Sequence, residues 1–169
     1  MHRVYFISLF LFLATCFTPS VAQEITPKNQ IELQHDNDFI LLTDRYYSSG
    51  LYLTYRRRLD RGIFGTDQEQ LDFQLQYLAF TPDNVEAFDP ASFDRTYAGF
   101  LGLESSWTHT QVTSMFRFSL LTGLVGPSSS AGNFQRWYHE NIVLFKVPTW
   151  AAELENQFHV NASFTYAKE

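Results

Sequence analysis

Long runs of alternating polar and apolar residues constrain the fold of this chain more than any other feature. In the clearest run, residues 152–166, apolar side chains occupy every second position, with one interruption at Asn156. Such a period of two predicts a β-strand with two unlike faces. The run covers roughly 15 residues, whereas strands of soluble domains average ~5–6 and a strand that crosses a bilayer needs ~9–11. The length therefore favours a membrane-spanning strand.

Five further segments alternate in the same way, so the sequence predicts an all-β protein with about six antiparallel strands. The other strands are expected near residues 30–41, 49–59, 71–79, 97–109 and 112–125. Aromatic residues make up 17% of the chain, yet the mean hydropathy is only −0.19. This combination is typical of a transmembrane β-barrel, because only one face of each strand meets lipid. A soluble β-sandwich also alternates and is the alternative fold.

One segment departs from the period of two. Residues 131–145 follow a Gly-Pro-Ser-Ser-Ser sequence that suits a turn and a helix cap. Within the segment, Phe134, Trp137 and Tyr138 recur at helical spacing. The pattern predicts one short helix with an aromatic side, placed before the last strand.

The N-terminus resembles a secretory signal. A short basic start precedes an apolar run at residues 4–17 and a small-x-small sequence at 20–22. The apolar run is too short for a membrane-spanning helix, which needs ~20 residues. We therefore predict a signal peptide over residues 1–22 and a mature chain over 23–169. The only cysteine, Cys16, lies in the signal, so no disulfide is expected; lipoprotein acylation at this cysteine is a weaker alternative.

A polar cluster interrupts the first predicted strand. Asp36, Asn37 and Asp38 are consecutive, although Asp and Asn are depleted in strands. Their carboxylate and amide oxygens are the hard ligands that Ca²⁺ prefers, and Asp44 could add another. The same residues also form a good turn sequence, so a plain turn is an equal alternative.

His139 is the second candidate for chemistry, on the predicted helix with Gln135 one turn earlier. Histidine is the usual general base near neutral pH, although a lone histidine on an aromatic helix is more often only packed. The sequence has no nucleophile elbow, P-loop or dinucleotide fingerprint, so neither a serine hydrolase nor a nucleotide-binding protein is indicated. The formal charge of −6 argues against nucleic acid as a partner. If the protein is a hydrolase, a metal ion with a histidine-activated water is the simpler scheme.

Five short motifs share their order and spacing with one known family. They are Asp36-Asn37-Asp38, Thr43-Asp44-Arg45-Tyr46-Tyr47-Ser48-Ser49-Gly50, Phe93-Asp94-Arg95-Thr96-Tyr97-Ala98-Gly99, Gly123-Leu124-Val125-Gly126-Pro127, and Gln135 followed by His139. Through these motifs the chain resembles the N-terminal half of the outer-membrane lipid A 3'-O-deacylases. The resemblance implies a β-barrel in the outer membrane of Gram-negative bacteria, lipid A or lipopolysaccharide as substrate, and Ca²⁺ as cofactor.

The resemblance also implies roles for individual residues. His139 matches the general base, which would activate a water to attack the ester. The residues implied for catalysis are His139, Asn37, Asp38 and Ser48. Those expected to contact substrate are Arg95, Tyr97 and Gln135. Those expected to hold Ca²⁺, which would stabilise the oxyanion, are Asp36, Asn37 and Asp38.

Several departures from the family pattern are visible. Asp36 replaces a glutamate, Thr96 replaces a proline, and a substrate-contacting lysine of some members has no counterpart near Ala87. Family members have about a dozen strands, so about six strands predict an incomplete barrel. We therefore expect a Ca²⁺-dependent hydrolase of the 3'-linked acyl ester of lipid A. The alternatives are a non-catalytic barrel fragment or porin-like protein, and an outer-membrane phospholipase.

Overall fold

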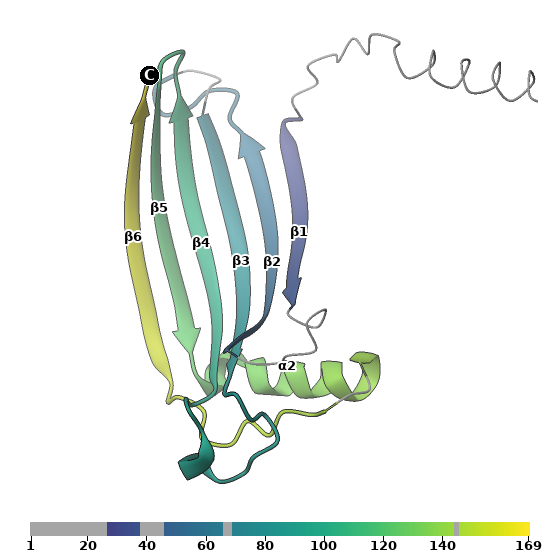
Figure 1. The fold of residues 1–169 in the computed structure, drawn as a ribbon. Coiled ribbons are helices and arrows are strands. Elements are labelled where there is room, and N and C mark those ends of the chain that lie inside the picture. Colours follow the sequence, from purple (N-terminus) through teal and green to yellow (C-terminus); the bar gives the residue numbers. More distant parts are fainter. Residues whose placement is uncertain (1–26, 38–45, 66–68, 144–145) are drawn as a thin grey trace, which may run out of the picture.

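Six antiparallel strands lie side by side in chain order and form one curved sheet in a computed structural model (Figure 1). The structure describes residues 27–37, 46–65, 69–143 and 146–169. The strands are β1 (Asn29–Asn37), β2 (Tyr46–Arg58), β3 (Glu69–Thr81), β4 (Ala98–Thr110), β5 (Ser114–Val125) and β6 (Gln157–Lys168). Strands β2 to β6 have 12 or 13 residues, enough for the ~9–11 that a bilayer crossing needs. The predicted number and direction of the strands are confirmed.

The two ends of the sheet differ in their connections. At one end, which we call the turn end, short segments join β2 to β3 and β4 to β5. The opposite end, the helix end, carries two longer connections, over residues 82–97 and 126–156. These contain the short helices η2 (Pro90–Ser92), η3 (Pro127–Ser129), α2 (Ala131–Tyr138) and the π-helical turn η4 (His139–Val143). The predicted short helix is confirmed as α2 and η4, which extend across the sheet near the ends of β1 to β3 (Figure 1).

The two faces of the sheet differ in polarity, because the strand register aligns residues of one kind across all six strands. One paired row, on what we call the apolar face, consists of Leu33, Leu53, Leu75, Leu103, Thr122 and Val160. The adjacent row, on the polar face, consists of Glu32, Thr54, Gln74, Glu104, Leu121 and Asn161. Many side chains of the apolar face are exposed, as expected for a barrel wall that meets lipid.

The last strand begins later than its alternation predicted. β6 starts at Gln157, because this residue pairs with Val125, the last residue of β5. The residues before it turn towards the start of β4 instead: the backbone N–H of Leu154 donates to the carbonyl of Tyr97 at 2.8 Å. Ala152 has a φ of 55°, which no regular strand contains. The prediction of one continuous strand from residue 152 was therefore wrong over its first five residues.

A small core fills the helix end, where α2 covers the apolar face. Its buried members are Ala79, Tyr97, Ala131 and Trp150. The hydroxyl of Tyr77 donates to the carbonyl of Ala131 at 2.9 Å. Gly99 permits this close docking, since a Cβ there would come within 2.2 Å of Ser129 Oγ and 2.4 Å of the Ala131 Cβ. The helix is thus held directly against β3 and β4.

The sheet is open over the described residues, with β1 and β6 at its edges, which agrees with the predicted incomplete barrel. None of the described helices is long and apolar enough to cross a membrane. The predicted signal peptide, Asp38 and Asp44 lie outside the described residues.

Candidate active site between the helix and the apolar face

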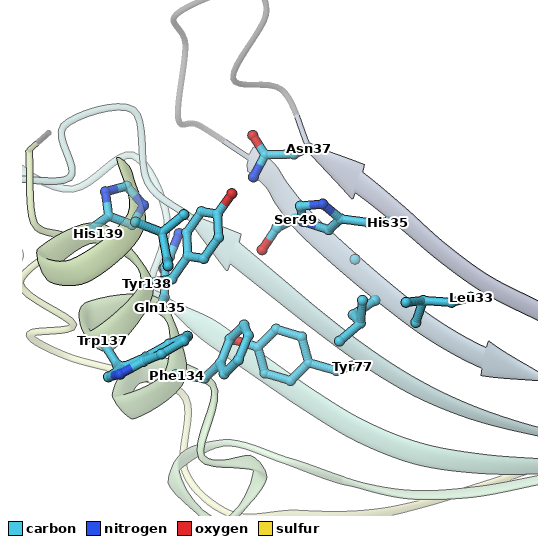
Figure 2. A pocket seen from close by; sticks show the side chains of 13 residues that line it. Leu33, His35, Asn37, Ser49, Tyr77, Phe134, Gln135, Trp137, Tyr138 and His139 are labelled. Carbon is cyan, nitrogen blue, oxygen red and sulfur yellow. The ribbon is translucent and has the colours of Figure 1, made fainter. Parts of the chain in front are cut away.

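A cavity of about 370 Å³ lies between α2 and the apolar face (Figure 2). Strands β1 to β3 form one wall, and α2 with η4 forms the other. The apolar lining consists of Leu33, Leu51, Tyr77, Phe134, Trp137 and Ile142. The polar side chains in the lining are His35, Asn37, Ser49, Gln135 and His139. A mostly apolar cavity with a few convergent polar groups is the usual form of a ligand site.

His139 lies where α2 passes into η4, and its side chain is 8% exposed. Its Nδ1 is 2.5 Å from the carbonyl oxygen of Lys146. Because a carbonyl can only accept, Nδ1 carries the hydrogen of this bond, and Nε2 of the neutral ring holds the lone pair. This tautomer is the one that a histidine needs to take a proton through Nε2.

Two hydrogen bonds fix Gln135, which is 3% exposed. The indole Nε1 of Trp150 donates to Gln135 Oε1 at 2.8 Å, and Gln135 Nε2 donates to Ser48 Oγ at 2.7 Å. Since an indole N–H can only donate, it determines which way the amide of Gln135 points. The sequence motifs singled out Gln135 and Ser48, but no signal in the sequence identified Trp150.

A β-bulge determines where Ser48 lies. Tyr47 pairs with Phe80 and Ser49 pairs with Ala79, so Ser48 is an additional residue in β2. In regular alternation Ser48 and Ser49 would point to opposite faces. With the bulge, Ser48 reaches Gln135 of the helix, while Ser49 lines the cavity. Bulges often redirect side chains in this way beside active sites.

The acidic cluster is divided between the two faces of the sheet. Asn37 lines the cavity, whereas the carboxylate of Asp36 accepts hydrogen bonds on the polar face. Its donors are the hydroxyl of Tyr47 at 3.2 Å and the amide of Gln34 at 3.0 Å. The predicted Ca²⁺ site of Asp36, Asn37 and Asp38 stays a prediction, since Asp38 lies outside the described residues. In the described part of the chain, no three His, Cys, Asp or Glu side chains are grouped to hold a metal ion.

Two predicted substrate-binding residues lie away from the cavity. Tyr97 is fully buried in the core, and its hydroxyl donates to the carbonyl of Val85 at 2.7 Å. The expectation that Tyr97 contacts substrate stays a prediction, while the structure places the residue in the core. Arg95 is exposed before β4, with its guanidinium 4.2 Å from the ring centre of Tyr46. Neither residue is part of the cavity lining.

His35 is a cavity residue that sequence reasoning did not favour. It is two residues before Asn37 in β1, so both side chains lie on the same face. Its ring is 6.2 Å from that of Tyr138 in α2, in an edge-on arrangement. Figure 2 shows His35 and Asn37 on the strand wall opposite the helix. The alternation of the first strand could have predicted that His35 shares a face with Asn37.

Two carboxyl groups at the helix end have shifted pKa values. The backbone N–H of Asp83, 2.8 Å away, holds the pKa of Asp94 below its usual value. Burial raises the pKa of Glu153, whose Oε1 makes no hydrogen bond within the described structure. Glu153 lies beside Gly99, directly under the start of α2. The structure thus places a carboxyl that retains its proton more readily next to the core.

Comparison with known proteins agrees with this architecture. Residues 7–169 match the family model described as "Outer membrane protein LpxR". The solved structure "LpxR from Salmonella typhimurium" is similar, with a TM-score of 0.60 and 26% sequence identity. The alignment covers 73% of this chain but 41% of that one, so the chain spans about two fifths of its length. Among curated proteins, none matches. Since the family match includes nearly every residue, the chain belongs to the LpxR family of outer-membrane proteins.

Proposed function

We propose that the protein hydrolyses the 3'-linked acyl ester of lipid A in the outer membrane, with His139 as the general base. One observation carries this proposal: a cavity that combines a general-base tautomer of histidine with an apolar lining lies on the face of the sheet that meets lipid. The resemblance of the motifs to lipid A 3'-O-deacylases supports the choice of substrate.

The position of the cavity suits a lipid substrate. One wall of the cavity is the apolar face, and Leu33 and Leu51 of that face line it. An acyl chain can enter between α2 and the sheet from the hydrocarbon without passing through water. The ester then lies beside Asn37 and His139, where the polar lining is found.

The chemistry follows from the tautomer of His139. Nε2 takes a proton from a water molecule, and the water oxygen attacks the ester carbonyl carbon. When the tetrahedral intermediate collapses, the bond to the sugar oxygen breaks, and the imidazolium returns its proton to that oxygen. The products are a free fatty acid and a sugar hydroxyl. Lys146 holds the ring through its carbonyl, while Gln135 and Ser48 join α2 to β2 and so keep His139 at the cavity wall.

Ca²⁺ suits the oxygen donors of residues 37 and 38. The amide oxygen of Asn37 is a hard donor in the lining, and the carboxylate of Asp38 follows it in the sequence. When bound, the ion would supply positive charge that stabilises the oxyanion. Asp36 is left out of this ligand set, because its carboxylate lies on the polar face.

The test is an assay of the full-length protein with lipid A in the presence of Ca²⁺, followed by mass spectrometry of lipid A. We expect loss of the mass of the 3'-linked acyl group, and no loss with Asn37→Ala or after chelation of Ca²⁺. A parallel reaction with phosphatidylethanolamine measures release of lysophospholipid. Lysophospholipid without lipid A cleavage would assign the protein as a phospholipase, and no product from either lipid would support a non-catalytic barrel.

A further inference from the structure

A band of aromatic side chains crosses the apolar face at the turn end. One paired row consists of Arg57, Leu71, Trp107, Phe118 and Phe164. In the next row, the rings of Phe116 and Tyr166 are 4.9 Å apart. Aromatic girdles of barrels lie where the hydrocarbon meets the lipid headgroups. The turn end therefore lies at the headgroups of one leaflet, and the helix end, with its cavity, lies at the other leaflet.

The turn between β2 and β3 is folded onto this band. The fully buried carboxylate of Glu69 accepts the backbone N–H groups of Ile63 and Phe64, both at 2.9 Å, and the indole N–H of Trp107 at 2.7 Å. The ring of Phe64 is 5.7 Å from that of Trp107. Ile63 and Phe64 are nevertheless 77% and 63% exposed. The turn thus presents fixed apolar side chains beside the aromatic band.

The same corner concentrates positive charge in a chain whose net charge is −6. Five of the 12 Lys and Arg residues lie here, namely Lys28, Arg56, Arg57, Arg58 and Arg61. Lys28 pairs with Asp60, and Arg56 pairs with Glu32. The other three arginines are exposed and form no ion pair within the described ranges. With the carboxylate of Glu69 counted alongside Asp60 and Glu32, the described residues of this corner keep an excess of two positive charges.

The register separates these arginines by face. Arg57 pairs with Leu71, so it lies on the apolar face in the row of Trp107. Arg58 pairs with Gln70 and lies on the polar face. Arg61 is exposed in the turn itself, two residues before Ile63. The guanidinium of Arg57 therefore lies on the lipid-facing side of the sheet, at the level of the lipid headgroups.

We propose that Arg57 and Arg61, with Ile63, Phe64 and Trp107, bind the headgroup of an anionic phospholipid in the leaflet opposite the proposed site of lipid A cleavage. A guanidinium matches the geometry of a phosphate oxygen pair, and anionic lipids attract cations at the membrane surface. The exposed Ile63 and Phe64 contact the upper acyl chains of the same lipid. Because Arg57 lies in the same row of the apolar face as Trp107, Phe118 and Phe164, the occupant is a lipid and not a soluble anion.

The test uses the full-length protein in phosphatidylethanolamine vesicles that contain phosphatidylglycerol as a minor component. Bromine atoms on the acyl chains of one lipid or the other quench nearby tryptophans. The contribution of Trp107 is the difference between the wild type and Trp107→Phe. We expect brominated phosphatidylglycerol to quench Trp107 more strongly than brominated phosphatidylethanolamine.

The variants Arg57→Gln and Arg58→Gln form a matched pair, since they remove the same charge from adjacent residues on opposite faces. We expect the preference for phosphatidylglycerol to fall severalfold in Arg57→Gln, to persist in Arg58→Gln and to fall less in Arg57→Lys, which keeps the charge but not the planar guanidinium. Equal quenching by the two lipids in the wild type would overturn the proposal. An equal loss in Arg57→Gln and Arg58→Gln would also overturn it, because only the overall charge would then matter. The heat-dependent gel mobility of each variant verifies that it is folded.

Discussion

One histidine is buried at each end of the apolar face, His139 in the helical segment that covers the face and His109 beneath the turn between β2 and β3. The two histidines differ in what surrounds them. His139 at the helix end is 8% exposed and His109 at the turn end is 5% exposed, so burial does not distinguish them. His139 lines the cavity, and its Nδ1 bonds to the carbonyl of Lys146. His109 is packed against the rings of Phe64 and Trp107, and its Nδ1 is 3.9 Å from the carboxylate of Glu69.

This contrast separates a candidate functional polar group from a structural one in the sheet. At the turn end, the carboxylate of Glu69 is satisfied by three N–H donors, and apolar rings occupy the remaining space. At the helix end, the polar side chains of Gln135 and His139 are held in position but line an open cavity. A buried histidine is therefore a candidate base only where its orientation is fixed and its surroundings are open.

Replacing each histidine in turn with glutamine tests this contrast between the two ends of the sheet. We expect His139→Gln to lower the rate of lipid A deacylation by about 10²–10⁴-fold, since a general base contributes that much. His109→Gln should keep the rate of the folded enzyme and lose about 1–2 kcal/mol of stability. Mass spectrometry of lipid A and urea unfolding in detergent micelles measure the two effects. Equal loss of activity in both variants would show that the cavity does not distinguish the histidines.

The turn end is expected to contribute more to stability than any site residue. Glu69→Ala leaves the N–H groups of Ile63, Phe64 and Trp107 without their acceptor, and each such loss costs about 1–3 kcal/mol when the group stays buried. We predict a decrease of about 3 kcal/mol or more in the free energy of unfolding. Glu32→Ala is the control, because its exposed ion pair with Arg56 is worth only about 0–1 kcal/mol. Similar losses for the two variants would remove the structural role of Glu69.

A smaller effect is expected from the tryptophan that orients Gln135. Trp150→Phe keeps an aromatic ring in the core but removes the donor to Gln135 Oε1. Loss of one such bond, worth about 1 kcal/mol, should lower kcat several-fold with little change in KM. The control is Trp137→Phe, which changes a side chain of the cavity lining and should affect KM more than kcat. An unchanged kcat in Trp150→Phe would show that Gln135 needs no orienting partner.

The smallest predicted effect concerns Glu153, whose pKa is raised by burial. The folded protein then keeps this proton at pH values where the unfolded chain has lost it, so stability falls as the pH rises from the unfolded to the folded pKa. Glu153→Gln removes the ionisation. We expect the variant to be more stable than the wild type at pH 8, with the difference decreasing towards pH 4 in urea unfolding. The exposed Glu155→Gln serves as a control for overall charge, and an equal pH dependence in both variants would exclude the role of burial.

Most of the scaffold could be predicted from the sequence because period two is a local property. A strand with unlike faces needs only its own residues, and six such patterns became six paired strands. The helix was similarly readable from the spacing of Phe134, Trp137 and Tyr138. The start of β6 was not, because Val125 determines where pairing ends and that partner lies in another strand.

The alternation, the helix and the motifs that contain Asn37, Ser48 and His139 can all be read from the residues alone. Which of their neighbours meet depends on how distant segments pack. The pleat of β1 sends Asp36 and Asn37 to opposite faces, and the bulge at Ser48 directs its hydroxyl to a helix that is 87 residues away in the chain. Burial of Tyr97 and the bond from Trp150 to Gln135 likewise depend on packing between distant segments. Local patterns specify which face a side chain takes in a regular element, whereas contacts across elements depend on register and docking, which no local pattern records.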